Sequence, residues 1–156
     1  MEPSARCLVL ACGNTLRSDD GVGPKLADWA AKRFQENEDV RVVARQQWTP
    51  DLAKDIAEAD SVLFVDSSAD SVPGRVSLAA VASNRGKGGP GTHHMEAYEL
   101  LGLTRSLYGS MSAHALLLTV GSGSTELGET LSDPVEAALP RAQGVLEKAV
   151  LRFLEN

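Results

Sequence analysis

Short apolar runs alternate with segments of helical periodicity along the chain, and this alternation restricts the fold more than any other feature. A continuous apolar run between turn residues is typical of a strand that is buried on both faces of a parallel sheet. Such runs predict strands at residues 7–11, 40–44, 61–65, 76–81 and 115–120. Helical spacing predicts helices at residues 22–34, from 49 onward, at 95–108 and from 133 to the C-terminal end.

Strands that alternate with helices form a mostly parallel sheet with helices on both of its faces. We therefore predict an α/β fold, a three-layer α/β/α arrangement around a twisted sheet of roughly five strands. Residues 76–81 follow a Pro-Gly turn and are expected to form an edge strand. Pro140 is expected to break the last helical segment, which then restarts as a long C-terminal helix. No repeat or linker divides the sequence, so residues 1–156 are predicted to form a single domain.

The composition excludes several classes of partner. A formal net charge of −6 argues against nucleic-acid binding, which needs a basic surface. No apolar run approaches the length of a transmembrane helix, and residues 1–6 lack the apolar region of a signal peptide. Cys7 and Cys12 share one predicted strand and are about 16 Å apart, beyond the reach of a disulfide. Free thiols suit a reducing compartment, and we expect a cytoplasmic protein without membrane insertion.

An acidic loop follows the first predicted strand. A Gly13-Asn14 turn is followed by the pair Asp19 and Asp20 and then by a helix start. The three-glycine fingerprint of dinucleotide sites is absent, and an acidic loop repels a pyrophosphate. Taken alone, an Asp-Asp-Gly sequence before a helix is typical of turn and capping chemistry. In an α/β fold, however, this position lies at the carboxyl end of a strand, where functional side chains gather.

Other residues with suitable chemistry are expected at the same edge of the sheet. Asp66 comes directly after the run 61–65, and His93 and His94 precede a predicted helix after a glycine-rich loop. Two acids and one histidine from three loops suit a divalent ion such as zinc, nickel, manganese or iron. His114 is interpreted as structural or exposed. Cys12 is the candidate thiol nucleophile, but it has no evident base partner, which favours a small buried residue.

Taken together, these motifs resemble those of the [NiFe]-hydrogenase maturation endopeptidases. The resemblance covers nearly the whole chain and rests on Gly13-Asn14, the loop 19–23, Asp66 after a hydrophobic strand, and a Thr-His pair before a helix. The segments 117–121 and 128–132 follow in the same order. The resemblance implies a phosphorylase/hydrolase-like fold, in which helices sandwich a twisted sheet. It also implies the activity of this family, the removal of a C-terminal extension from the hydrogenase large-subunit precursor after nickel insertion.

The resemblance also implies roles for individual residues. The family's metal-contacting residues match Asp20, Asp66 and His93, and Asp20 is the candidate catalytic base. The metal is nickel carried by the precursor, so no permanently bound metal is expected. Asp20 directly precedes the glycine of the motif, whereas Asp19 is expected to shape the turn, and Asn14 to hold the loop behind it. Either the nickel activates the scissile carbonyl or a water, or Asp20 acts as general base for that water.

The chain departs from the family pattern in two places. Ala11-Cys12-Gly13 replaces a Gly-x-Gly, and residues 46–49 (Gln-Gln-Trp-Thr) replace a Gly-Gly-Thr, which we interpret as the mark of a subgroup. Trp48 either lines the groove for the substrate tail or packs structurally. Two other functions remain open at this point: a non-catalytic chaperone that senses nickel loading, and a small-molecule hydrolase with a resident metal.

Overall fold

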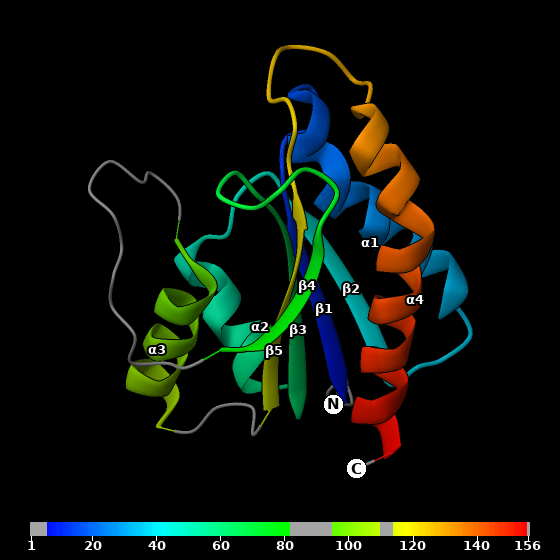
Figure 1. Cartoon of the computed structure of the whole chain (residues 1–156). Helices are drawn as coiled ribbons and strands as arrows, with labels where there is room; N and C mark the ends of the chain where they lie inside the picture. Colours follow the sequence, from blue (N-terminus) through cyan, green and yellow to red (C-terminus); the bar gives the residue numbers. More distant parts are fainter. Residues whose placement is uncertain (1–5, 82–94, 110–113, 156) are drawn as a thin grey trace.

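The computed structural model describes residues 6–81, 95–109 and 114–155, which form one sheet between two layers of helices (Figure 1). In these ranges the sheet has five strands in the order β2-β1-β3-β5-β4. Strands β1, β2, β3 and β5 are parallel, and β4 pairs with β5 in the antiparallel direction. The strands are β1 (Cys7–Cys12), β2 (Val40–Arg45), β3 (Ser61–Ser68), β4 (Val76–Ala80) and β5 (His114–Gly121). The predicted α/β class and the three layers are confirmed.

The helices are divided between the two faces of the sheet (Figure 1). Helices α1 (Val22–Arg33) and α4 (Asp133–Glu155) pack on one face. Helices α2 (Ala53–Ala57) and α3 (Ala97–Tyr108) pack on the other. Short 3₁₀ turns precede α1 and α2, at Ser18–Gly21 and Pro50–Leu52.

Each face of the sheet contributes alternate residues of the same strands to a separate core. In β1, Val9 and Ala11 face α1 and α4, whereas Leu8 and Leu10 face α2 and α3. A strand buried on both sides needs apolar residues at every position, which explains the continuous runs in the sequence. Each fully buried Leu or Val contributes roughly 1.5–3 kcal/mol to the free energy of unfolding, so the two cores hold the central strands firmly.

Two predictions about element boundaries were wrong. β3 continues past Val65 to Ser68, because Asp66, Ser67 and Ser68 keep pairing with β5. Pro140 does not break the last helix but lies inside α4. It is on the exposed side of α4, where the carbonyl that loses its partner can be solvated. Meanwhile Ala138 and Ala142 continue one buried stripe across it.

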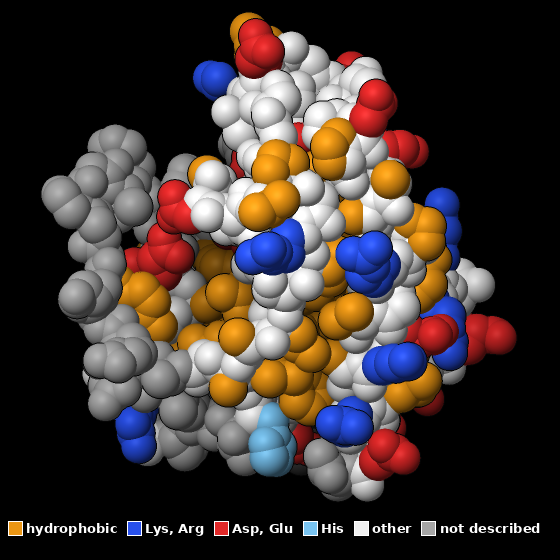
Figure 2. Space-filling view, viewed as in Figure 1, with side chains coloured by type: hydrophobic (Ala, Val, Ile, Leu, Met, Phe, Trp, Pro, Cys, Tyr) orange, Lys and Arg blue, Asp and Glu red, His pale blue; other side chains and the backbone are white. Residues whose placement is uncertain are grey.

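β4 is an edge strand, as predicted, and most of its side chains are exposed. Figure 2 shows hydrophobic side chains gathered on this face of the molecule, over β4 and the adjacent part of β5. The two cysteines are buried free thiols. None of the described helices combines the length and the hydropathy that crossing a membrane requires.

The strand order places a topological switch point between β1 and β3. From β1 the chain passes through α1 to β2 on one side, and then through α2 to β3 on the other. In open α/β sheets, ligands bind at the carboxyl ends of the strands at such a point. β1 ends there at Cys12, and β3 carries Asp66 there. The acidic loop that follows β1 lies at the same edge of the sheet.

Candidate active site

Asp19 is a buried anchor between two loops. Its side chain has no exposed area, and its carboxylate accepts hydrogen bonds from four donors. Asp19 Oδ2 accepts hydrogen bonds from Gly123 N at 2.6 Å and from Ser124 N at 2.9 Å. Ser132 contributes the other two bonds, both at 2.7 Å: its backbone N donates to Oδ1 and its Oγ donates to Oδ2. Burial opposes ionisation, but the bonds from Ser132, Gly123 and Ser124 outweigh it and hold the pKa of Asp19 below its usual value. Asp19 therefore fastens the acidic loop to the loop after β5.

The turn that carries the two acids has a special backbone conformation. Ser18 has a φ of 49°, in the left-handed region that non-glycine residues rarely adopt. It is held there by Ser18 N, which donates to Gly128 O at 2.7 Å, and by Ser18 Oγ, which donates to Glu126 O at 2.7 Å. The consequence is that the neighbouring carboxylates reach different partners. Asp19 bonds into the loop after β5, and Asp20 bonds toward the end of β3.

Asp20 links the acidic loop to the two central strands. Its Oδ2 accepts a hydrogen bond from Asn14 N at 2.7 Å, and its Oδ1 accepts one from Ser67 Oγ at 3.1 Å. Gly13 permits this close packing, since a Cβ at that position would lie 2.0 Å from Asp20 O. With one bond to each oxygen, the half-buried carboxylate keeps lone pairs for a ligand or a water. The contact to Asn14 agrees with the predicted supporting role of that residue.

Asp66 lies beside Asp20 in a less favourable environment for charge. Its Oδ1 accepts a hydrogen bond from Ser67 N at 2.8 Å, and the thiol of Cys12 donates a second bond to the carboxylate. Burial is the main reason that the pKa of Asp66 is raised to about 7. The charges of Asp20 and Glu96 also raise this pKa, whereas the two hydrogen bonds lower it. The two candidate metal-contacting acids are therefore close enough to interact electrostatically, and Asp66 exchanges its proton near neutral pH.

Glu96 belongs to this site although the sequence pattern did not identify it, and Cys12 belongs to it as the small buried residue that the sequence favoured. The pairing of Ala11 with Val65 puts Cys12 next to Asp66 on the neighbouring strand. Burial and the charge of Asp66 raise the pKa of the Cys12 thiol, so it serves as a hydrogen-bond donor and not as a nucleophile. Glu96 caps α3 through a reciprocal capping box with Glu99. A Glu three residues ahead of another Glu before an apolar run was the sequence signal for this cap.

The structure bears differently on the remaining residues that the sequence analysis singled out, which are three histidines and Trp48. His93 and His94 lie outside the described residues. Within the described part of the chain, no group of three His, Cys, Asp or Glu side chains is arranged to hold a metal ion. His114 begins β5 at the opposite end of the sheet, is exposed, and stacks on Phe153, in agreement with its interpretation as structural or exposed. Trp48 is buried and packs edge-on against Phe64, with ring centroids 5.1 Å apart, so it belongs to the core.

The structure is thus an α/β protein with two carboxylates at the switch point of a mostly parallel sheet, the position where ligands bind in open α/β sheets. No family model and no curated protein sequence matches the chain. Solved structures do match it. The hydrogenase 2 maturation peptidase from Thaumarchaeota archaeon SCGC_AB-539-E09 shares 26% identity at a TM-score of 0.68, over 93% of this chain and 97% of that one.

Two further structures have the same fold over similar lengths. The [NiFe] hydrogenase maturation protease HycI from Thermococcus kodakarensis KOD1 shares 24% identity at a TM-score of 0.70, over 97% of this chain and 94% of that one. The hydrogenase maturating endopeptidase HybD from E. coli shares 20% identity at a TM-score of 0.72, over 94% of this chain and 93% of that one. The 26% identical peptidase confirms the resemblance of the chain to the [NiFe]-hydrogenase maturation endopeptidase family, and the other two structures show the shared fold.

Proposed function

We propose that the protein is an endopeptidase that removes the C-terminal extension from a [NiFe]-hydrogenase large-subunit precursor after nickel insertion. The proposal rests on the proximity of Asp20 and Asp66 at the switch point of the sheet, in a fold shared with hydrogenase maturation peptidases. The precursor would be its partner, and the two buried free thiols suit a reducing compartment such as the cytoplasm as the place where the two meet.

The nickel of the precursor is the recognition element in this proposal. Asp20 and Asp66 offer carboxylate oxygens at one edge of the sheet, and His93 would add an imidazole from the segment before α3. Oxygen and imidazole donors suit a divalent ion of this kind. Because the metal arrives with the substrate, an empty precursor lacks the group that these side chains bind. The protein itself would then need no permanently bound metal.

Two routes to peptide-bond cleavage fit the described side chains. In the first, Asp20 takes a proton from the attacking water, and the lone pairs left on its carboxylate make it available for this task. In the second, the substrate's nickel supplies Lewis-acid activation of the carbonyl or of the water, and the carboxylates only hold the complex. In both, the bond from Asn14 N fixes the direction of the Asp20 carboxylate.

The direct test is to incubate the purified protein with a nickel-loaded large-subunit precursor and to measure the mass of the precursor. We expect the mass to fall by that of the C-terminal extension, and an Asp20→Asn variant to leave it unchanged. Binding of the precursor without truncation by the wild type would contradict the peptidase and favour a chaperone. A stoichiometric metal in the protein as isolated would instead favour a hydrolase with a resident ion.

A further inference from the structure

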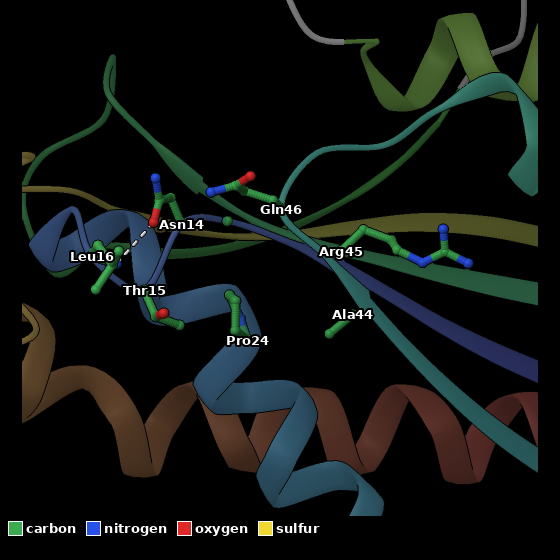
Figure 3. A pocket seen from close by; sticks show the side chains of 8 residues that line it. Asn14, Thr15, Leu16, Pro24, Ala44, Arg45 and Gln46 are labelled. Atoms are coloured by element: carbon green, nitrogen blue, oxygen red, sulfur yellow. Dashed lines mark hydrogen bonds between the residues drawn. The ribbon is translucent and has the colours of Figure 1, made fainter.

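A groove lies next to the acidic loop, on the side of the sheet edge formed by β2 (Figure 3). Its volume is about 310 Å³, near the lower end of the range for ligand pockets. The loop after β1, the first turn of α1 and the end of β2 form its walls. Its lining residues are Gly13, Asn14, Thr15, Leu16, Pro24, Ala44, Arg45 and Gln46.

The groove shares a wall with the candidate catalytic acid. Asn14 lines the groove, and its backbone N–H donates to Asp20 Oδ2 at 2.7 Å. The side-chain oxygen of Asn14 accepts a bond from Leu16 N at 2.9 Å, which fixes the next part of the wall (Figure 3). Asn14 therefore connects the lining of the groove to the Asp20 carboxylate, which is not itself a lining residue.

The lining suits an uncharged polypeptide segment. It contains no acid, and its one cation, Arg45, has a guanidinium that lies 3.6 Å from Asp51 and points away from Asn14 (Figure 3). Gly13, Pro24 and Ala44 provide small surfaces. The side-chain amides of Asn14 and Gln46 lie along one side of the groove, and an amide both donates and accepts hydrogen bonds, as a peptide group does.

Two more features favour an extended chain. β2 is at the end of the strand order, so within the described ranges its outer edge pairs with no strand. An extended peptide can add to such an edge through main-chain hydrogen bonds. Leu16 stands at the groove with 56% of its surface exposed, which offers an apolar contact to a side chain of that peptide.

We propose that this groove binds an extended segment of the precursor polypeptide next to the scissile bond and delivers that bond to Asp20. The inference rests on the proposed function and adds a subsite to it. Leu16 contacts a side chain of the bound segment, and Gln46 bonds its backbone. Neither residue takes part in bond cleavage, so both act on the binding of the precursor.

A pair of matched variants tests this inference. Leu16 and Leu127 are both exposed leucines, at 56% and 79%, on segments joined by the bond from Gly128 N to Leu16 O at 2.9 Å, but of the two only Leu16 lines the groove. For Leu16→Ser we expect the KM for nickel-loaded precursor to rise about ten-fold, with kcat and the melting temperature unchanged. Leu127→Ser should keep the wild-type KM. Gln46→Ala should raise KM as well. Gln46→Asn keeps the side-chain amide, so it should raise KM less than Gln46→Ala does.

The outcomes separate the two levels of the proposal. If the wild type leaves the precursor uncut, the proposed function fails. If the wild type cuts but Leu16→Ser and Gln46→Ala keep its KM, the groove inference alone is overturned. It is also overturned if Leu127→Ser raises KM equally, or if the groove variants lower kcat without changing KM.

Discussion

Asp19 and Asp66 are two largely buried acids at the same edge of the sheet, and their environments differ in nearly every respect. Asp19 accepts four hydrogen bonds, and its pKa is held below the usual value. Asp66 accepts two, lies near Asp20 and Glu96, and has a pKa raised to about 7. An acid that is saturated with donors stabilises the fold, whereas an acid that lacks them remains available to a ligand. Asp20, with one donor on each oxygen, belongs with Asp66.

The largest expected effect comes from Asp20. Asp20→Asn should lower the rate of precursor processing at least about a hundred-fold, the usual contribution of a general base. Its melting temperature should stay within about 2 °C of the wild type, since Asn keeps one acceptor oxygen and both bonds of Asp20 are part-buried. Processing assays and thermal unfolding of the same preparation measure both. If the variant still processes the precursor at the wild-type rate, Asp20 does not belong to the active site.

The histidine pair gives an effect of similar size in a single comparison. His93→Ala should abolish processing, because His93 is the proposed third contact to the nickel of the precursor, and His94→Ala should leave most of it. The same assay, with both variants run in parallel, decides the assignment. The reverse pattern would move the role from His93 to His94.

Asp19 should affect stability most. Asp19→Asn removes the negative charge to which Gly123, Ser124 and Ser132 donate hydrogen bonds. We expect the free energy of unfolding to fall by about 3 kcal/mol. Because the folded-state pKa is depressed, this stabilisation is present above the unfolded pKa and is lost as the pH falls through the folded value. The difference between wild type and variant should therefore shrink in acid. Denaturant titrations at pH 7 and pH 3 measure it, and a constant difference would contradict the anchor.

Asp66 should respond to pH with the opposite sign. Its folded-state pKa of about 7 lies above that of the unfolded chain, so the native state holds an extra proton between pH 4 and 7. Wild-type stability then falls through that window as the pH rises. Asp66→Asn has no such proton to lose, so its stability relative to the wild type should increase by on the order of 4 kcal/mol as the pH rises from 4 to 8. Asp60→Asn, at a carboxylate whose side chain is 80% exposed, serves as a control with little such change.

Much of the fold could be predicted because the central strands are buried on both faces. Runs such as 61–65 and 115–120 have no other good interpretation once helices separate them. The end of β3 could not be read from the pattern, because pairing with β5 carries the polar residues Asp66 to Ser68 into the ladder. Pro140 was misjudged for a related reason, since burial of the stripe through Ala138 and Ala142 outweighs one missing hydrogen bond.

The candidate site was predictable only in part. Alternation places Asp20 and Asp66 at one edge of the sheet, but their hydrogen bonds come from partners that lie far away in the sequence. Asp19 meets Ser132 across 113 positions, and Asp20 meets Ser67 across 47. No feature of the neighbouring sequence distinguishes the roles of Asp19 and Asp20 as clearly as these long-range hydrogen bonds do. Likewise Cys12 became a partner of Asp66 only through the register of β1 and β3.

The most direct test of the account compares one precursor in two states. Nickel-loaded and nickel-free large-subunit precursor are incubated with the wild-type protein, and the mass of each is followed over time. We expect the loaded precursor to lose its C-terminal extension while the empty one stays intact, because the nickel of the substrate is the group that Asp20 and Asp66 are proposed to bind. Cleavage of both at equal rates, or of neither, would contradict it.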